Sequence, residues 1–254
     1  MQIALTRSVP PSIVQCELTH LERAPIDPER AAAQHAEYEE ALRRMGCRVE
    51  RLAETPELPD SVFVEDTAIV LDEVAVVTRP GAPSRRAEIA TAAAALQAYR
   101  PVAAIAAPAT VDGGDVLVVG RRMFVGLSAR TNGEGVRQLS AIVSPFGYSV
   151  QPVPIDGCLH LKSAVTQVGP EVLLCNPAWV DPGTFAGLNA IPVPGEEPFA
   201  ANVLRIGSSV LCPAAHAKTA AELTRRGFDV YSVDVSELAK AEGGITCCSL
   251  LVRA

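Results

Sequence analysis

Chemically distinctive residues recur at nearly even intervals along this chain, each near the start of a strand–strand–helix–strand pattern. Glu65 is followed after 47 positions by Asp112, and a further 48 positions lead to His160. Asn202 comes 42 positions later, and Cys247 another 45. A period of roughly 20–50 residues is the signature of a repeat array. The spacing therefore predicts five ββαβ units around one axis, with these five residues at the centre.

Alternating strand and helix patterns define the units. The first expected helix has Pro28 near its start and Gly46 beyond its end, and Ser84 stands where the second would be capped. We predict helices at 28–45, 84–98, 132–145 and 216–226; the Pro- and Gly-rich stretch after 175 makes a poor helix. We predict strands at 3–6, 48–52, 61–64, 67–71, 75–78, 116–119, 123–125, 148–153, 163–168, 171–175, 201–206, 209–212, 230–233 and 245–252.

The two ends of the chain are predicted to share one unit. The last repeat has its strands at the C-terminus, but no helix follows them. The N-terminal strand and the first helix would complete that repeat and close a ring. We therefore expect residues 1–254 to form a single catalytic domain.

Composition limits the classes of partner. The formal net charge is −7, which argues against a nucleic-acid partner and is compatible with a small cationic substrate. No run approaches the roughly 18 apolar residues that span a bilayer, and the first residues do not resemble a signal peptide. Seven scattered cysteines, without zinc spacing, favour a reduced, cytoplasmic protein.

The segment from Glu242 to Leu250 carries the strongest chemical candidate. Two glycines allow a sharp bend before Cys247, so its thiol can face a cleft, although most free cysteines are simply small buried hydrophobes. Alternation along a strand sends Cys247 and Cys248 to opposite faces. Alternation likewise places the His160 side chain on one face and those of Leu159 and Leu161 on the other. This pattern fits a catalytic histidine and an ordinary core histidine equally.

Several charged residues are also placed unusually. Glu65 and Asp66 stand inside an apolar run, where burial requires a cationic partner, and carboxylates match a planar guanidinium. Asp112 begins an Asp-Gly-Gly-Asp segment that is either part of a site or a tight turn. Arg85 at a helix start opposes the helix dipole, and Arg130 lies in a second loop. Carboxylate binding and simple surface solvation both remain open for these two arginines.

Seven motifs, in order along the chain, resemble the dimethylarginine dimethylaminohydrolases. That family belongs to a wider guanidine-modifying group with arginine deiminases and amidinotransferases. The motifs are SVFVED (Ser61–Asp66), TRPGAPSRR (Thr78–Arg86), VDGGDVL (Val111–Leu117), GLSARTN (Gly126–Asn132), LHLKS (Leu159–Ser163), AAN (Ala200–Asn202) and GGITCCS (Gly243–Ser249).

The resemblance implies a five-bladed α/β propeller that hydrolyses asymmetric dimethylarginine and monomethylarginine to citrulline and the methylated amine, without a cofactor. It implies that Cys247 is the nucleophile and His160 the proton donor. Glu65 and Asp66 would hold the guanidinium. Asp60, Arg85 and Arg130 would hold the amino-acid end of the substrate, with Arg85 and Arg130 at its carboxylate. In this family-based interpretation, Leu18 belongs to a flexible lid loop, and the backbone around Ala241 and Glu242 contacts the α-amino group of the substrate.

Some alternatives stay open from the sequence. Some bacterial relatives carry Glu at the position of Asp112, so either Asp112 or Glu65 is expected to orient His160. The substrate could be arginine itself, as in an arginine deiminase, and a non-catalytic guanidinium-binding propeller is a second alternative. No HxxxH or similar cluster suggests a metal site. The sequence leaves monomer and homodimer open.

Overall fold

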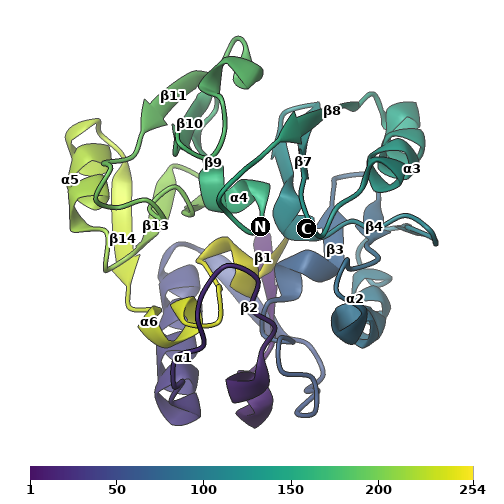
Figure 1. The fold of residues 1–254 in the computed structure, drawn as a ribbon, viewed down its shortest axis with the longest axis horizontal. Helices are drawn as coiled ribbons and strands as arrows, with labels where there is room; N and C mark the ends of the chain where they lie inside the picture. Colours follow the sequence, from purple (N-terminus) through teal and green to yellow (C-terminus); the bar gives the residue numbers. More distant parts are fainter. Residues whose placement is uncertain (254) are drawn as a thin grey trace.

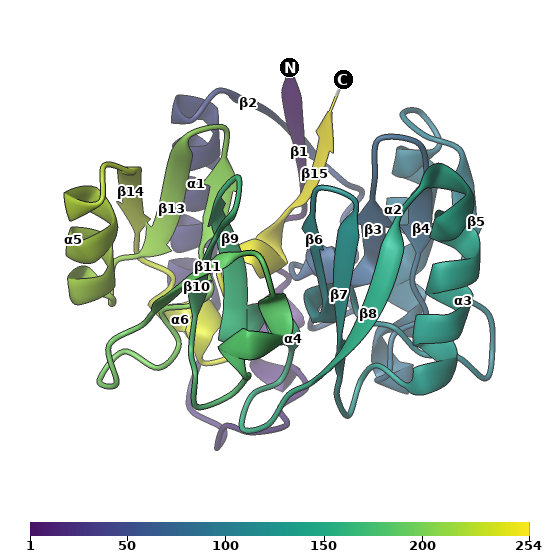
Figure 2. The ribbon, with the colours of Figure 1, turned by 90° about the horizontal axis from the view of Figure 1, so that it is seen from above.

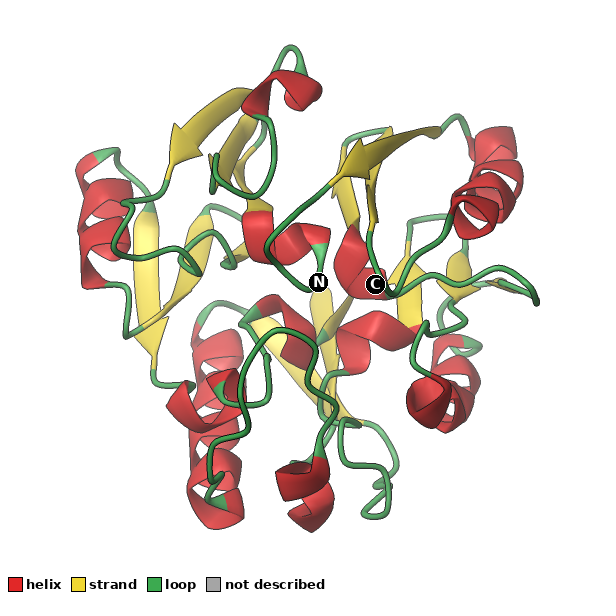
Figure 3. Cartoon of the chain, in the orientation of Figure 1, coloured by secondary structure: helices red, strands yellow, loops and turns green. Residues whose placement is uncertain are grey.

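Five three-stranded sheets surround a common centre. The computed structural model describes residues 1–253, so Ala254 at the end of the predicted domain lies outside the described residues. Figure 1 shows the sheets arranged as a ring, with α1, α2, α3 and α5 at its periphery. Figure 3 shows the same separation, with strands inside and long helices outside. The predicted five-bladed α/β propeller of ββαβ units is confirmed.

Each unit repeats one strand order. The first strand pairs antiparallel with the second, and the second pairs parallel with the third. Four units are complete within the chain: β3 (Ala68–Val70), β4 (Ala75–Val77) and β5 (Val102–Ala104); β6 (Val116–Val119), β7 (Arg122–Leu127) and β8 (Ser149–Pro154); β9 (Val165–Gly169), β10 (Val172–Cys175) and β11 (Asn189–Pro192); β12 (Leu204–Ile206), β13 (Ser209–Pro213) and β14 (Asp229–Val233).

A crossover connects the two parallel strands of each unit, as parallel pairing requires. The crossover helices are α1 (Pro28–Arg44), α2 (Ile89–Leu96), α3 (Gly133–Val143) and α5 (Ala217–Arg225), and the Pro-rich unit has only the 3₁₀ turn Pro182–Phe185. Shorter helices are Pro11–Gln15, Pro83–Glu88, Ser144–Phe146 and α6 (Ser236–Ala239). No helix within residues 1–253 is long and apolar enough to cross a membrane.

The fifth sheet joins the two ends of the chain. Strand β15 (Leu250–Arg253) pairs antiparallel with β1 (Gln2–Thr6), from Gln2 opposite Arg253 to Leu5 opposite Leu250. Strand β1 then pairs parallel with β2 (Cys47–Arg51) across α1. Figure 2 shows the first and last strands side by side. The predicted closure of the ring is therefore confirmed.

Local sequence explains where the first helix begins and ends. The Asp27 side chain accepts hydrogen bonds from the backbone N–H groups of Glu29 and Arg30, and Gly46 follows the helix with φ of +91°. The prediction that Ser84 caps the second helix is wrong. A 3₁₀ turn from Pro83 to Glu88 precedes α2, and the Ser84 hydroxyl instead donates to Glu17.

Apolar side chains fill the space between neighbouring units. One cluster joins Ile3 and Leu5 of β1 and Val252 of β15 to Val64 and Ala75 of the next unit. Burial of such aliphatic side chains contributes about 1.5–3 kcal/mol each. The units are thus held together laterally, and their inner ends lie at fixed positions.

The inner ends of the units differ from the prediction. Strands were predicted to begin at residues 61, 163 and 245, but short helical turns stand at or near these places. The turns at the inner ends are Val64–Thr67, Gly113–Asp115, α4 (Leu161–Ala164) and Thr246–Cys248. Likewise β12 starts at Leu204, three residues later than predicted. A short apolar run fits either a strand or a helical turn by periodicity alone, which explains the error. Strands β5 and β11 were not predicted.

Candidate active site

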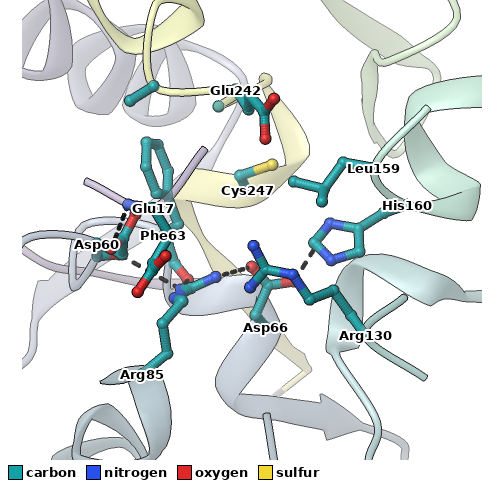
Figure 4. Close-up of a pocket in the computed structure, with 12 residues that line it drawn as sticks. Glu17, Asp60, Phe63, Asp66, Arg85, Arg130, Leu159, His160, Glu242 and Cys247 are labelled. Atoms are coloured by element: carbon teal, nitrogen blue, oxygen red, sulfur yellow. Dashed lines mark hydrogen bonds and ion pairs between the residues drawn. The ribbon is translucent and has the colours of Figure 1, made fainter. Parts of the chain in front are cut away.

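The five recurrent residues lie at the turns that precede the first strands. Beside them is a small cavity whose interior holds roughly one or two water molecules. Figure 4 shows side chains from distant segments pointing into it. Its lining residues are Glu17, Asp60, Phe63, Asp66, Arg85, Arg130, Leu159, His160, Ala241, Glu242, Gly243 and Cys247.

His160 is held between carboxylates. It is only 4% exposed at the start of α4; its Nε2 lies 3.1 Å from Asp112 Oδ2, and its Nδ1 lies 3.8 Å from Asp66 Oδ1. Burial alone would lower the His160 pKa, but Asp66, Asp115 and Asp112 together raise it to about 9. The imidazole is therefore protonated at neutral pH and can donate a proton.

Asp112, rather than Glu65, contacts His160. The other oxygen of Asp112 accepts from the backbone N–H of Gly81 at 2.8 Å, which fixes the carboxylate. The shorter side chain reaches the ring because the Gly113-Gly114 turn brings the backbone close. A Cβ on Gly114 would lie 2.6 Å from His160 Nδ1.

Asp66 is a buried carboxylate that faces the cavity. Arg85 Nη1 donates to Asp66 Oδ2 at 2.6 Å, and the backbone N–H of Gly114 donates to Oδ1 at 2.9 Å. Burial would raise the Asp66 pKa, but His160 and Arg85 hold it well below its usual range. Arg85 also pairs with Glu88 at 2.8 Å. Its guanidinium therefore already holds two carboxylates at the cavity edge, while its predicted contact with the substrate carboxylate stays a prediction.

Cys247 lies on the helical turn Thr246–Cys248. Its Sγ accepts a hydrogen bond from the Gly244 N–H at 3.3 Å, and the side chain is partly exposed to the cavity. Burial, followed by the negative charges of Glu65 and Asp66, raises the Cys247 pKa to about 12. Cys248 is fully buried. Only one of the two thiols thus faces the cavity, as predicted, although a helical turn and not strand alternation separates them.

Glu65 is absent from the lining of the cavity, and its predicted guanidinium contact stays a prediction. Its carboxylate accepts from Lys162 Nζ at 2.6 Å and from Thr246 Oγ1 at 2.7 Å. Asn202 completes this layer by accepting from the Thr246 N–H and donating to Thr246 Oγ1 and to the Lys162 carbonyl. The physical reason is the helical turn at 64–67, which sends neighbouring Glu65 and Asp66 to different sides. One carboxylate thereby links the turns that carry His160 and Cys247.

The N-terminal loop covers the cavity. Asp60 accepts from the Glu17 N–H at 3.1 and 3.2 Å, and Arg130 Nη2 donates to Thr19 Oγ1 at 3.0 Å. The Glu242 carboxylate accepts backbone N–H groups from Thr19, His20 and Leu21 at 2.5–2.9 Å. Leu18 packs against a core cluster that contains Phe63 and Ala241. Asp60, Arg130, Ala241 and Glu242 line the cavity as the sequence suggested; Leu18 lies in the covering loop.

Asp66, Asp112 and His160 are the group within residues 1–253 whose spacing would suit a metal ion. Their ligand atoms already have protein partners: Arg85 and Gly114 for Asp66, and Gly81 for Asp112. The donor set therefore fits a hydrogen-bonded acid site better than a metal centre. The absence of a required metal or cofactor stays a prediction.

Sequence reasoning missed several contributors to the site. Glu17, Phe63 and Leu159 line the cavity, and Leu159 does so beside His160 instead of facing the opposite side. Lys162 and Asp115 act beneath it: Asp115 accepts from the Leu161 N–H at 3.0 Å, and burial raises its pKa to about 6. Glu88, three residues after Arg85, could have been recognised from helical spacing. The other partners are too distant in sequence for any local signal.

Comparison with known proteins confirms the resemblance. Residues 17–178 match the family model described as N,N dimethylarginine dimethylhydrolase, eukaryotic. The dimethylarginine dimethylaminohydrolase of Streptomyces coelicolor is 40% identical over 252 residues, covering 98% of this chain and 96% of the relative. That of Pseudomonas aeruginosa is 38% identical over 226 residues, covering 88% and 89%.

Solved structures agree. A cysteine-to-serine variant of the Pseudomonas aeruginosa enzyme, in complex with citrulline, superposes with a TM-score of 0.92 at 36% identity and 98% coverage of both chains. The N-terminal domain of the cyanobacterial arginine dihydrolase ArgZ has a TM-score of 0.88 at 18% identity, which shows a shared fold. The chain described here belongs to the dimethylarginine dimethylaminohydrolase family.

Proposed function

We propose that this protein hydrolyses Nω-methylated arginines to citrulline and methylamine or dimethylamine. The observation that carries the proposal is one cavity lined by a thiol, a charged imidazole and a fixed carboxylate, from Cys247, His160 and Asp66. These are the three groups that nucleophilic displacement at a guanidinium carbon requires: a nucleophile, an acid and an anion that holds the cation.

The reaction begins when the substrate cation binds. Before substrate binds, the Cys247 thiol keeps its proton because burial raises its pKa to about 12. A guanidinium held by Asp66 places positive charge beside the sulfur and lowers the cost of forming the thiolate. The thiol releases its proton to solvent, and the thiolate attacks the guanidinium carbon and forms a C–S bond. Substrate binding and nucleophile activation are thus coupled.

His160 moves the protons of the next two steps. Its imidazolium protonates the departing methylated nitrogen, the C–N bond breaks, and the amine leaves. The neutral imidazole then takes a proton from water, whose oxygen adds to the carbon of the S-alkylthiouronium. Breakage of the C–S bond releases citrulline and restores the thiol. Asp112 holds the ring in place through its 3.1 Å contact with Nε2.

The remaining lining residues suit the amino-acid end of the substrate. Arg130 is the arginine of the cavity that no carboxylate of residues 1–253 pairs with, so we assign it to the substrate carboxylate. Asp60 lines the same cavity and suits a cationic α-amino group, which also meets the backbone around Ala241 and Glu242. We propose that one propeller domain contains the whole site. Its seven free cysteines fit the reducing cytoplasm.

The test is citrulline formation by the purified protein with asymmetric dimethylarginine and with arginine, side by side. We expect citrulline and dimethylamine from the methylated substrate, and none from Cys247→Ser. Citrulline mainly from arginine would keep the chemistry and overturn the substrate. Citrulline from neither substrate, in folded protein with a titratable Cys247 thiol, would contradict the proposed function.

A further inference from the structure

A groove adjoins the site on the other side of Cys247. Its volume is about 470 Å³, far more than the cavity itself, and most of its lining is apolar. Four residues line both hollows: Leu159, Glu242, Gly243 and Cys247. The nucleophile therefore stands at the inner end of the groove, and Leu159, next to His160 in Figure 4, stands at the boundary.

The outer part of the groove exposes large apolar side chains to solvent. Phe199 is 49% exposed and Leu21 is 38% exposed, and both line it. The Phe199 ring is fixed edge-on against Trp179, with centroids 4.9 Å apart. Apolar walls that lead to a reactive group are typical of a ligand pocket. The thiol at the inner end restricts the occupant, because what it attacks is a guanidinium carbon.

We propose that this groove receives an apolar Nω-substituent larger than methyl, such as a propyl or butyl chain, on the guanidinium of an arginine substrate. The proposal rests on the proposed function and extends its substrate class. No new chemistry is needed. The C–N bond to the substituted nitrogen breaks, the alkylamine leaves with a proton from His160, and water supplies the oxygen of citrulline.

The wild-type protein should turn over Nω-butylarginine with kcat/KM within about tenfold of that for Nω-methylarginine. Each methylene that leaves water gains roughly fourfold in binding, which offsets the cost of fixing the chain. A double variant, Ala215→Phe with Ala239→Phe, fills the groove at two exposed positions outside the cavity. Ala217→Phe, exposed on α5 and outside the groove, is the matched control.

We expect the filled variant to lose at least about tenfold in kcat/KM for the butyl substrate and to keep the methyl value within twofold, with no change in the control. The proposal that the groove receives the substituent is overturned if wild type turns over only the methyl substrate, or if the filled variant loses equally for both substrates. Turnover of neither overturns the proposed function instead. In that case, protection of Cys247 from iodoacetamide by Nω-butylarginine tests whether the groove binds the butyl chain. Equal protection in the wild type and the filled variant overturns the proposal.

Discussion

His160 faces a different carboxylate with each ring nitrogen. Nε2 has Asp112 at hydrogen-bonding distance, whereas Nδ1 is 3.8 Å from Asp66, beyond a normal hydrogen bond. We therefore propose that Asp112 orients the imidazole and stabilises its protonated form, and that Nδ1 donates the proton to the substrate. Both carboxylates contribute to the raised His160 pKa of about 9, which keeps the acid loaded at physiological pH.

The pH profile tests this assignment. A group with a pKa of about 9 is protonated below that pH and loses its proton above it, so kcat should fall as pH rises through about 9. Asp112→Asn keeps an acceptor for Gly81 but removes the negative charge. We expect kcat to drop roughly 10²-fold and its alkaline limb to move to lower pH. If the alkaline limb of the Asp112→Asn profile is unchanged, Asp112 does not raise the pKa of His160.

Residue spacing predicted part of this site and missed the rest for a physical reason. The interval of 48 positions identified Asp112 and His160 as equivalent positions in neighbouring units, and the structure brings them into contact. Lys162 was not identified, because its partner Glu65 lies 97 positions away and an ion pair across the ring leaves no local pattern. Burial of Glu65 had only indicated that some cation must be near it.

At the scale of elements, one side chain holds three consecutive residues of the covering loop. Glu242 adopts φ of +57°, an uncommon conformation for a side-chain-bearing residue, and from there accepts three consecutive N–H groups of the loop. The closed cavity is too small for an amino acid, so the loop must open for substrate to enter. Glu242 is therefore placed to control opening.

Limited proteolysis reports this fastening. Arg23 follows the fastened residues and lies in the same loop, so trypsin cleaves after it only when the loop opens. Glu242→Ala should speed that cleavage about tenfold or more, because the loss of charge-assisted hydrogen bonds costs about 1.5–3 kcal/mol. Glu171→Ala, which removes an exposed carboxylate in the turn between β9 and β10, is the control and should not change the rate. If trypsin cleaves Glu242→Ala and wild type at the same rate, Glu242 does not control the opening of the loop.

The helical turn that carries Cys247 is fixed from beneath. Thr246 Oγ1 donates to Glu65 and accepts from Asn202, so removal of this hydroxyl leaves two buried polar groups short of a partner. Gly244 has no room for a side chain, since a Cβ there would lie 2.4 Å from Asn202 Oδ1. The turn geometry is thus determined by contacts with two other units.

Thr246→Val should therefore affect catalysis more than binding. We expect a loss of about 1–3 kcal/mol in the free energy of unfolding and a fall in kcat of at least tenfold, with KM changed less than threefold. Thr246→Ser, which restores the hydroxyl, should recover most of kcat. Steady-state kinetics and denaturant titration measure both quantities. If the serine variant is as slow as the valine variant, the hydroxyl does not position the thiol.

At the scale of the whole molecule, the ring is closed by the pairing of its first and last strands. Leu5 on β1 is 1% exposed and lies opposite Leu250 of β15, so it is a buried part of the pairing that joins the two ends of the chain. No unit can bury its flanks alone, because each core cluster draws on neighbouring units. The propeller should behave as one cooperative domain.

Weakening the closure should therefore destabilise every unit together. Leu5→Ala should lower the free energy of unfolding by about 3 kcal/mol in a single transition, with circular dichroism and citrulline-forming activity lost at the same denaturant concentration. Two separate transitions in this variant or in wild type would contradict the single-domain prediction.

The repeat order was predictable because each crossover helix is amphipathic or Ala-rich and each strand pair is strongly apolar. The α1 boundaries agree within one residue, since Asp27, Pro28 and Gly46 determine them locally. The inner turns were not predictable. A three-residue turn such as Thr246–Cys248 is stabilised by contacts with other units, not by its own periodicity.

The central claim is that Cys247 becomes covalently attached to the substrate during turnover. It is tested most directly by acid quench of the protein during turnover of asymmetric dimethylarginine, followed by mass spectrometry of its peptides. The account predicts an adduct equal to the substrate less dimethylamine, located on Cys247 and not on Cys248. Wild-type turnover by Cys247→Ser, or an adduct located on another residue, would contradict it.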